Sequence, residues 1–303
     1  MTPGKPSRSL ALTRRRWLGM AATGGLVLAG LSPEVQVMAQ QAGQFVMGPP
    51  MPDIAPVQVS SRVWVVPAAD GFPTPANQGM MSNVTFVVTS AGVVILDSGS
   101  SLQIGQMVIR MIRRITPLPV VAVFNSHYHG DHWLGNHAFA NAFGPSLPIF
   151  SLAHTQQMIR GHAGTLWKGL MERWTNQSTL GTEVVAPNQV VEHGQTLRLG
   201  GLTFKMHHYG TAHTPSDLSV QVVEEGLTCV GDVAMGNRIA NMDDGSFPGT
   251  LAYYGRLEQA AAAQLWVPGH GQALGRQGQQ LAHDVFVAQH HADREEAHKR
   301  LLS

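Results

Sequence analysis

The sequence lacks several features that would mark a small disulfide-stapled scaffold, a nucleic-acid-binding protein or a membrane protein. A single cysteine, Cys229, excludes an internal disulfide framework. Only 13% of the 303 residues are charged and the formal net charge is +1, so no basic face for nucleic acid is expected. The apolar run 19–31 is shorter than the roughly 20 residues that a spanning helix needs. Hydrophobic residues make up 44% of the chain, which is enough for a sizeable core, and the histidine count is high at 15.

The N-terminal segment has the composition of an export signal. The run Thr-Arg-Arg-Arg-Trp-Leu at 13–18 precedes the apolar run 19–31, and Val-Met-Ala at 37–39 offers small residues for cleavage. This pattern resembles a twin-arginine export signal at 1–39, which implies the Tat export machinery as a partner, a periplasmic mature protein and no stable membrane span after cleavage. Residues 1–39 carry five Lys/Arg and one Glu, a charge of +4, so +1 minus +4 leaves about −3 for the mature chain.

The remainder predicts one domain of the α/β class. Residues 40–56 are rich in Gly, Pro, Gln and Met, which favours an extended N-terminal arm, and no linker divides 57–303. Strand-like runs alternate with helical periodicity in the first half, and strands dominate the second, which predicts layered sheets and helices. We expect strands at 57–66, 84–88, 93–96, 120–124, 149–152, 184–185, 190–191, 197–199, 202–206, 218–223, 227–230 and 265–267. We expect helices at 102–115, 133–143, 154–174, 250–264 and 276–302.

The stretch 127–132, His-Tyr-His-Gly-Asp-His, carries three imidazoles and one carboxylate within six residues. It directly follows the apolar run 120–124, so its polar side chains are expected in the loop at the end of a buried strand. Gly130 permits a tight backbone path there. Because imidazole is the commonest metal ligand, this loop predicts a metal site.

Three further stretches place a ligand-type residue beside glycine at the end of a predicted strand. His213 lies in Gly-Thr-Ala-His-Thr-Pro-Ser-Asp, Asp232 in Val-Gly-Asp, and His270 in Pro-Gly-His-Gly. A single histidine of this kind is more often a core or surface residue. Together with the cluster at 127–132, these residues predict one shared site. Asp97 also follows a predicted strand, at 93–96.

With these motifs in this order, the chain from about Val57 to His270 resembles the metallo-β-lactamase fold superfamily. The resemblance implies a four-layered αββα sandwich of two mixed β-sheets flanked by helices. It also implies two metal ions. The first ion would be held by His127, His129 and His213. The second would be held by Asp131, His132 and His270, with Asp232 as the bridge between the ions.

The resemblance further implies a zinc-dependent hydrolase. A hydroxide held between two Zn²⁺ ions would attack an ester, thioester, lactone or amide-type bond of a small-molecule substrate, and Asp131 would act in catalysis by accepting a proton. Ligation rich in nitrogen suits zinc, while iron stays possible because ligand preferences overlap. Superfamily members with di-iron redox chemistry typically have Glu where this chain has His129, which favours zinc here.

Two details separate the chain from β-lactamases that use a cysteine ligand. Cys229 falls inside an apolar strand, three residues before Asp232, and is expected to be a buried thiol. The runs 81–89 and 95–100 are similar to hydrolases found beside periplasmic quinoprotein or sulfur-oxidation systems.

Asp97 has two open interpretations, either orienting a ligand histidine or accepting hydrogen bonds at the helix start near Ser100.

Three other functions stay open at this point. They are β-lactamase activity within the same fold, an iron-dependent redox enzyme of the persulfide dioxygenase type, and a non-catalytic metal-binding partner of a periplasmic oxidoreductase. Substrate choice is expected to depend on the loops 71–81 and 166–181. Other candidates are the aromatic residues Phe247, Tyr253 and Tyr254 and the cations Lys168, Arg173 and Arg238.

Overall fold

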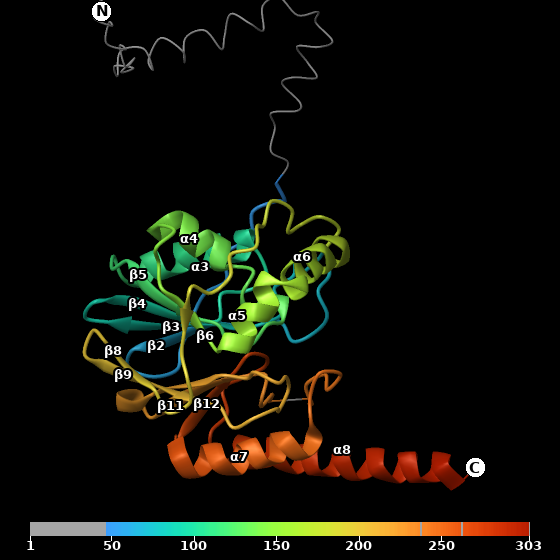
Figure 1. The fold of residues 1–303 in the computed structure, drawn as a ribbon. Helices are drawn as coiled ribbons and strands as arrows, with labels where there is room; N and C mark the ends of the chain where they lie inside the picture. The colour runs from blue at the N-terminus through green and yellow to red at the C-terminus, as the bar shows by residue number, and fades with distance from the viewer. Residues whose placement is uncertain (1–46, 237, 262, 303) are drawn as a thin grey trace, which may run out of the picture. The chain divides into compact units, whose positions relative to one another are not determined.

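The computed structural model describes residues 47–236, 238–261 and 263–302. The predicted export signal at 1–39 and the first part of the predicted arm lie outside these residues. Within the described part, two mixed β-sheets lie face to face, with helices over the outer face of each (Figure 1). This arrangement confirms the predicted αββα sandwich.

The first sheet has seven strands in the order β1-β2-β3-β4-β5-β6-β7, antiparallel from β1 to β4 and parallel from β4 to β7. Its strands are β1 (Val57–Gln58), β2 (Val63–Val66), β3 (Val84–Thr89), β4 (Gly92–Leu96), β5 (Val120–Phe124), β6 (Ile149–Ser151) and β7 (Gln189–Val190). The second sheet has the order β12-β11-β10-β9-β8, in which only β11 and β12 are parallel. Its strands are β8 (Thr196–Leu199), β9 (Leu202–His207), β10 (Ser219–Val222), β11 (Leu227–Gly231) and β12 (Leu265–Pro268).

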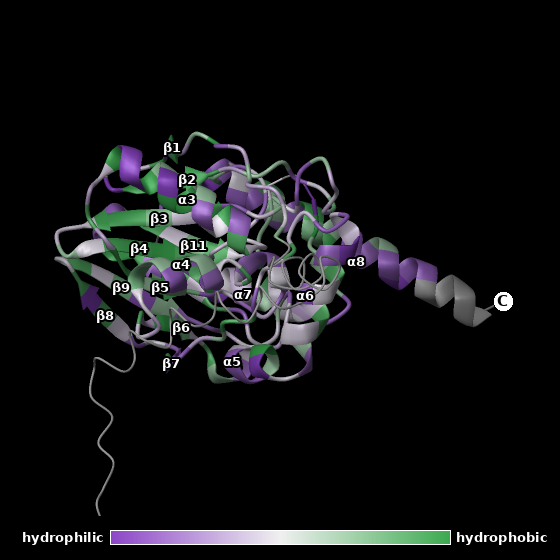
Figure 2. Ribbon diagram, turned by 90° about the horizontal axis from the view of Figure 1, so that it is seen from above, coloured by the Kyte–Doolittle hydropathy of each residue, from purple (hydrophilic) through white to green (hydrophobic). Residues whose placement is uncertain are grey.

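The alternation of side chains along the strands explains the layers. In β4, Val93 and Ile95 join the core beneath the helices, while Val94 and Leu96 join the core between the two sheets. Both faces of this strand are buried, which is why its sequence is apolar throughout (Figure 2). The helices α3 (Leu102–Ile115) and α4 (Asn136–Phe143) cover the first sheet, and α7 (Phe247–Ala261) and α8 (Arg276–Leu302) cover the second.

Helix α3 matches its predicted bounds, and its N-cap is Ser101. The side chain of Ser101 accepts a hydrogen bond from the backbone N–H of Ile104. Asp97 is therefore not the helix-start acceptor, and that interpretation was wrong.

The long helix predicted at 154–174 is two helices, α5 (Ala153–Arg160) and α6 (His162–Trp174). The helix is interrupted at Gly161. The backbone N–H of this residue donates to the carbonyls of Gln157 and Met158, which ends the first helix. The predicted strand at 184–185 was also wrong. Its two valines pack on different hydrophobic clusters without joining a sheet.

Two other boundaries differ because short turns interrupt the expected elements. The predicted strand 57–66 is a hairpin, β1 and β2, whose turn residues Ser60 and Ser61 donate hydrogen bonds to Glu225. The helix predicted from residue 133 begins at Asn136, because the short 3₁₀ turn η2 (Gly130–His132) and a further turn occupy the preceding positions.

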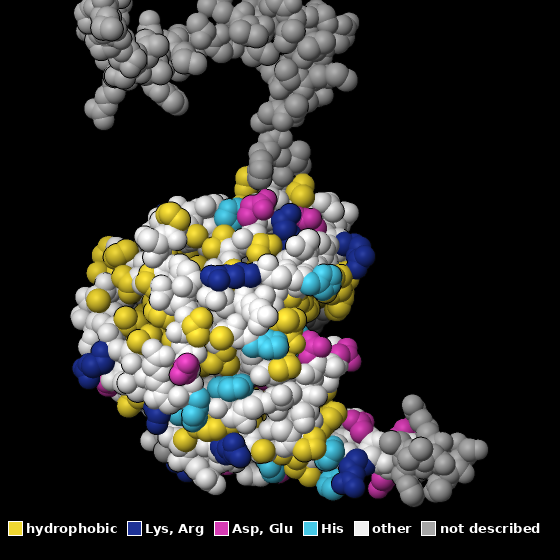
Figure 3. Space-filling view, viewed as in Figure 1, with side chains coloured by type: hydrophobic (Ala, Val, Ile, Leu, Met, Phe, Trp, Pro, Cys, Tyr) yellow, Lys and Arg dark blue, Asp and Glu magenta, His cyan; other side chains and the backbone are white. Residues whose placement is uncertain are grey.

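The described part of the predicted arm, residues 47–56, forms no helix or strand, and Met51 and Asp53 contact α3. Arg110 donates to the carbonyl of Met51 at 2.7 Å and forms an ion pair with Asp53 at 2.8 Å. Within the described part of the chain, no helix is both long enough and apolar enough to cross a membrane. On the face drawn in Figure 3, Lys and Arg side chains lie scattered among uncharged ones and form no basic patch.

Candidate metal centre

The predicted site residues meet because their strands end at the same edges of the two sheets. Asp97 follows β4 and the loop 125–132 follows β5, and these strands are parallel neighbours. Asp232 and His270 follow β11 and β12, which are also parallel neighbours. His213 lies between β9 and β10, and the start of β10 lies beside the end of β11 because these two strands are antiparallel.

The structure brings all seven predicted side chains together in three overlapping groups whose ligand atoms lie within 4.8 Å of one another. The first group is His127, His129 and His213, and the third is Asp131, His132 and His270. The remaining group joins Asp232 to His127 and His132, one residue from each of the other two. The geometry therefore has the two predicted triads with one shared carboxylate.

Asp232 occupies the middle of this arrangement. Its Oδ2 lies 3.6 Å from Nε2 of His213 and 3.3 Å from Nε2 of His270. Its Oδ1 lies 3.4 Å from Nε2 of His132. On the side of the second triad, Oδ2 of Asp131 lies 3.1 Å from Nε2 of His270. Each carboxylate thus touches more than one imidazole nitrogen across a space of a few ångströms.

Several polar atoms that face this space are buried and have no hydrogen-bond partner among the described residues. They are Nε2 of His127, Nε2 of His132 and Oδ1 of Asp232. Buried polar groups are nearly always paired, so three orphans aimed at one point indicate a missing partner. Imidazole nitrogens and carboxylate oxygens are ligands of divalent transition metals, so the residues present fit a metal pair.

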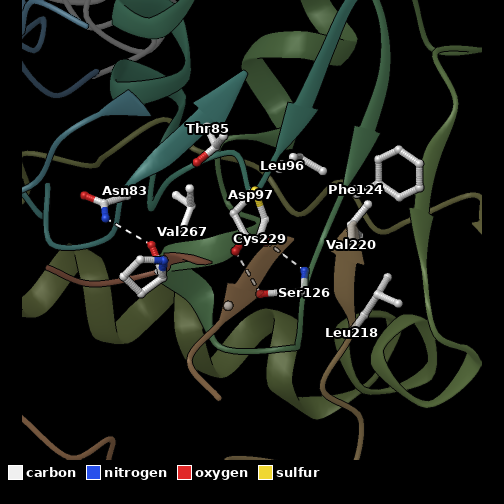
Figure 4. Close-up of a pocket in the computed structure, with 13 residues that line it drawn as sticks. Asn83, Thr85, Leu96, Asp97, Phe124, Ser126, Leu218, Val220, Cys229 and Val267 are labelled. Atoms are coloured by element: carbon white, nitrogen blue, oxygen red, sulfur yellow. Dashed lines mark hydrogen bonds between the residues drawn. The ribbon is translucent and has the colours of Figure 1, made fainter. Parts of the chain in front are cut away.

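Asp97 orients the second triad through His132. Its Oδ2 accepts from Nδ1 of His132 at 2.8 Å. It also accepts from Ser126, the hydroxyl bonding Oδ2 at 2.8 Å and the backbone N–H bonding Oδ1 at 2.7 Å (Figure 4). A carboxylate on Nδ1 fixes the tautomer that leaves Nε2 free as a ligand. Asp97 adopts a φ of +57°, a left-handed conformation that Asp tolerates better than most residues. The geometry therefore supports the interpretation that Asp97 orients a candidate ligand histidine.

The first triad is held by other partners. Nδ1 of His127 lies 3.0 Å from the hydroxyl of Ser126, and Nδ1 of His213 lies 2.8 Å from the carbonyl of Asn241. His129 presents the opposite nitrogen: its Nδ1 lies 2.9 Å from His213, and its Nε2 lies 3.3 Å from Oδ2 of Asp244. Sequence reasoning missed Asp244, whose only signal was its place in an acidic pair before a glycine.

The ionisation of the site reflects its burial and its mixed charges. Burial, followed by the charge on His132, lowers the pKa of His127 well below its ordinary value. Burial opposes charge on His270, but Asp232 and Asp131 outweigh it and raise the pKa of His270 to about 10. Burial also disfavours charge on Asp232, but the neighbouring His270 and His132 hold its pKa well below the usual range. The buried carboxylates therefore require positive charge beside them, which protons or metal ions can supply.

Gly269 shows how closely the backbone approaches the site. A Cβ at this position would lie 2.3 Å from Oδ1 of Asp232 and 2.7 Å from Cε1 of His132. No side chain fits there without displacing one of these two residues. The glycine that precedes His270 in the sequence motif is thus required by packing.

A cavity of about 580 Å³ opens onto the candidate ligands. It is lined by Gly71, Phe72, Pro73, Met81, His129, Asp131, Trp167, Trp174, His213, Asp232, Met235, Arg238, Asn241, Asp243, Asp244 and His270. Both predicted loops, 71–81 and 166–181, therefore contribute to its wall. The predicted aromatic residues of the second half do not: Tyr253 and Tyr254 are buried in the core beside α8, and Phe247 packs on Phe286.

Cys229 is buried, as predicted, and belongs to the core between the sheets. It lines a separate space of about 20 Å³ behind Asp97 (Figure 4). Burial raises the pKa of its thiol far above the ordinary range, so the thiolate form is disfavoured. Cys229 is not a member of any of the three ligand groups.

The chain matches the family model of the metallo-β-lactamase superfamily over residues 77–288. A solved metallo-β-lactamase from Pontibacter korlensis superposes with a TM-score of 0.62 at 16% identity, covering 77% of this chain and 99% of that one. The metallo-β-lactamase IND-7 gives a TM-score of 0.58 at 19% identity, covering 80% and 98%. The mono-zinc form of FIM-1 from Pseudomonas aeruginosa gives 0.59 at 16% identity, covering 79% and 97%. At these identities the solved structures establish the fold, and the family model establishes that this chain belongs to the metallo-β-lactamase superfamily, whose members are generally metal-dependent hydrolases.

Proposed function

We propose that this protein is an exported, periplasmic hydrolase that holds two Zn²⁺ ions and cleaves an ester, thioester, lactone or amide-type bond. The observation that carries the proposal is the pair of ligand triads that share Asp232. Two adjacent divalent ions supply Lewis acidity and lower the pKa of a water molecule, which gives a nucleophile at neutral pH. Export through the twin-arginine pathway rests on the sequence pattern at 13–39.

The protein's own residues would divide the remaining work. His127, His129 and His213 form the first ligand set, and Asp97 and Asp244 keep the nitrogens of His132 and His129 correctly aimed. Asp131 lines the cavity as a carboxylate, since the histidines beside it outweigh burial and lower its pKa. We assign it the role of accepting the proton that a water nucleophile releases.

Two features favour zinc and a substrate other than a β-lactam. Five of the seven candidate ligands are imidazoles, a donor set that suits Zn²⁺. The place that would bridge the ions is taken by Asp232, while the chain's cysteine faces the core between the sheets. Esters, thioesters and lactones are therefore the first substrates to examine.

The test combines metal analysis with a substrate panel. We expect the purified mature chain to hold two zinc ions and to hydrolyse at least one ester, thioester or lactone, with the rate lost on chelation and restored by zinc. A cephalosporin in the same panel examines β-lactamase activity, and oxygen consumption with a persulfide examines the redox alternative. Equal hydrolysis rates before and after complete removal of the metal would refute metal-dependent catalysis. His129→Ala compares the enzyme with a non-catalytic binding module: a variant that keeps partner binding but loses turnover favours the enzyme.

A further inference from the structure

One wall of the 580 Å³ cavity is aromatic. Phe72 packs edge-on against Trp174 with ring centroids 4.7 Å apart, and Trp174 lies edge-on to Trp167 at 6.2 Å. Trp167 in turn lies 5.0 Å from the imidazole of His129. A continuous series of rings therefore leads from the cavity mouth to a candidate metal ligand. Such rings bind other rings through offset or edge-on contacts.

The wall is assembled from separate parts of the chain and is only partly covered. Phe72 belongs to the loop that precedes β3, whereas Trp167 and Trp174 belong to α6. Phe72 is 61% exposed, which is unusual for a large apolar side chain. Both tryptophans are half-buried, in contrast to the fully buried Trp133 and Trp266 of the core. These rings keep apolar surface available inside the cavity, so they are not explained by core packing alone.

Part of the cavity rim is acidic. Asp243 and Asp244 are both exposed there. The carboxylate of Asp244 accepts from the hydroxyl of Tyr128 at 3.0 Å and lies 3.3 Å from Nε2 of His129, so it stands beside the candidate ligands. Among the described residues that line the cavity, Arg238 is the one Lys or Arg, and its Nε lies 2.8 Å from Asp70. The rim therefore offers little to a carboxylate on the substrate and repels it at short range.

Given the hydrolase function proposed above, we propose that the cavity selects uncharged substrates whose acyl part carries an aromatic ring, held against Phe72, Trp167 and Trp174. The ring would stack or meet the wall edge-on while the reactive carbonyl points to the ligand groups. The acidic rim then discriminates against acyl groups that end in a carboxylate. A cavity of this size accommodates a small molecule of ordinary ligand dimensions.

The first experiment measures binding without any bond cleavage. The metal-loaded mature protein is titrated by ligand-observed NMR with 3-phenylpropanamide, hexanamide and the para-carboxylate of 3-phenylpropanamide. We expect the neutral aromatic amide to bind about 3- to 10-fold more tightly than hexanamide, a range set by the strength of single aromatic contacts. Phe72→Ala should remove most of that preference. Asp243→Asn should improve binding of the carboxylated amide by about twofold, as expected for loss of one exposed like charge.

The matched control is Leu166→Ala. Leu166 is also a large exposed apolar residue, at 43%, and it lies on α6 beside Trp167 but does not line the cavity. We expect this variant to retain the wild-type preference. Because Phe72 is largely exposed, its loss should leave folding intact, and circular dichroism checks this directly.

The second experiment compares hydrolysis of the 3-phenylpropanoyl and hexanoyl thioesters of N-acetylcysteamine, which share one neutral thiol. A kcat/KM ratio in favour of the aromatic acyl group that falls in Phe72→Ala supports the inference. If both thioesters are cleaved equally and both neutral amides bind equally, the hydrolase stands and the aromatic preference is overturned. If neither thioester is cleaved but the aromatic amide binds selectively through Phe72, the preference stands and thioester hydrolysis fails. Selective binding that survives Phe72→Ala overturns the assignment to this wall.

Discussion

The inner and outer halves of the cavity are built in different ways. The inner half consists of side chains that follow strand ends, and residues such as Asp131, Asp232 and His270 are almost completely buried. The outer half consists of loop and helix residues such as Phe72 and Asp244, which are exposed. Strand ends in paired sheets have fixed positions, whereas loops tolerate change. The sheets therefore determine the chemistry that is possible, and the loops determine which substrate reaches it.

The largest effect expected in the inner half comes from Asp232→Asn. The substitution keeps the shape of the side chain but removes the charge shared by both triads. We expect the bound metal to fall below two ions per chain and kcat/KM to fall by more than about 100-fold, because even partners of ligands contribute 10- to 100-fold. Metal analysis and steady-state kinetics measure both quantities. His283→Ala, on the distant helix α8, is the control and should match the wild type. Full metal content in Asp232→Asn would contradict the shared role.

Removal of the metal should lower the stability of the inner half more than substitution of any single residue that hydrogen-bonds a ligand. Because ions that bind only the folded state stabilise it, we expect the free energy of unfolding to drop by about 3–4 kcal/mol for each bound ion when free metal falls from 100–1,000 times its Kd to zero. Urea unfolding with buffered zinc and with chelator measures the difference. In Asp232→Asn the difference in unfolding free energy between the zinc and chelator conditions should be smaller than in the wild type. Coincident unfolding curves for the wild type under both conditions would show that the residues hold no ion.

The next effect comes from Asp97→Asn, at the base of the inner half. Asparagine tolerates the left-handed backbone at this position, but its one amide oxygen cannot accept both the backbone N–H of Ser126 at Oδ1 and the Nδ1 of His132 at Oδ2, as the carboxylate does. His132 then loses the partner that fixes its tautomer. We expect zinc affinity to fall by 10- to 100-fold in a competition assay with a fluorescent chelator, as is typical for such partners. An unchanged affinity would mean that burial alone orients His132.

The two halves of the cavity also differ in how much of them could be predicted from the sequence. The candidate ligands could be picked out because histidine and aspartate recur beside glycine where apolar strands end, and the structure brings those residues together. Their division into two triads with a shared aspartate came from the family resemblance. The sequence does not decide the role of Asp97, because its contacts with Ser126 and His132 span 29 and 35 residues and depend on the pairing of β4 with β5. The exact division of α5 from α6 depended on Gly161, a residue that helices often tolerate.

The outer half was less predictable for a physical reason. Asp244 contacts His129 across 115 residues, and nothing in its local sequence indicates that partner. The loops 71–81 and 166–181 were expected near the site, but Tyr253 and Tyr254 were not distinguishable by type from Trp167 and Trp174. Only the packing of α7 against the second sheet shows that those tyrosines belong to the core. Aromatic composition alone cannot tell a cavity wall from a core.

The smallest expected effect comes from Asp244→Asn, which is the outer counterpart of Asp97→Asn. Both carboxylates accept from the second nitrogen of a candidate ligand, but Asp244 lies 3.3 Å from His129 with 49% of its side chain exposed. Water can therefore replace it as the partner of Nε2, whereas Asp97 is only 7% exposed and is much less accessible to water. We expect zinc affinity to fall by less than about tenfold in the same competition assay, with less effect than Asp97→Asn. Equal losses in the two variants would show that exposure does not weaken the outer contact, and the division between a rigid inner half and an adjustable outer half would fail at His129.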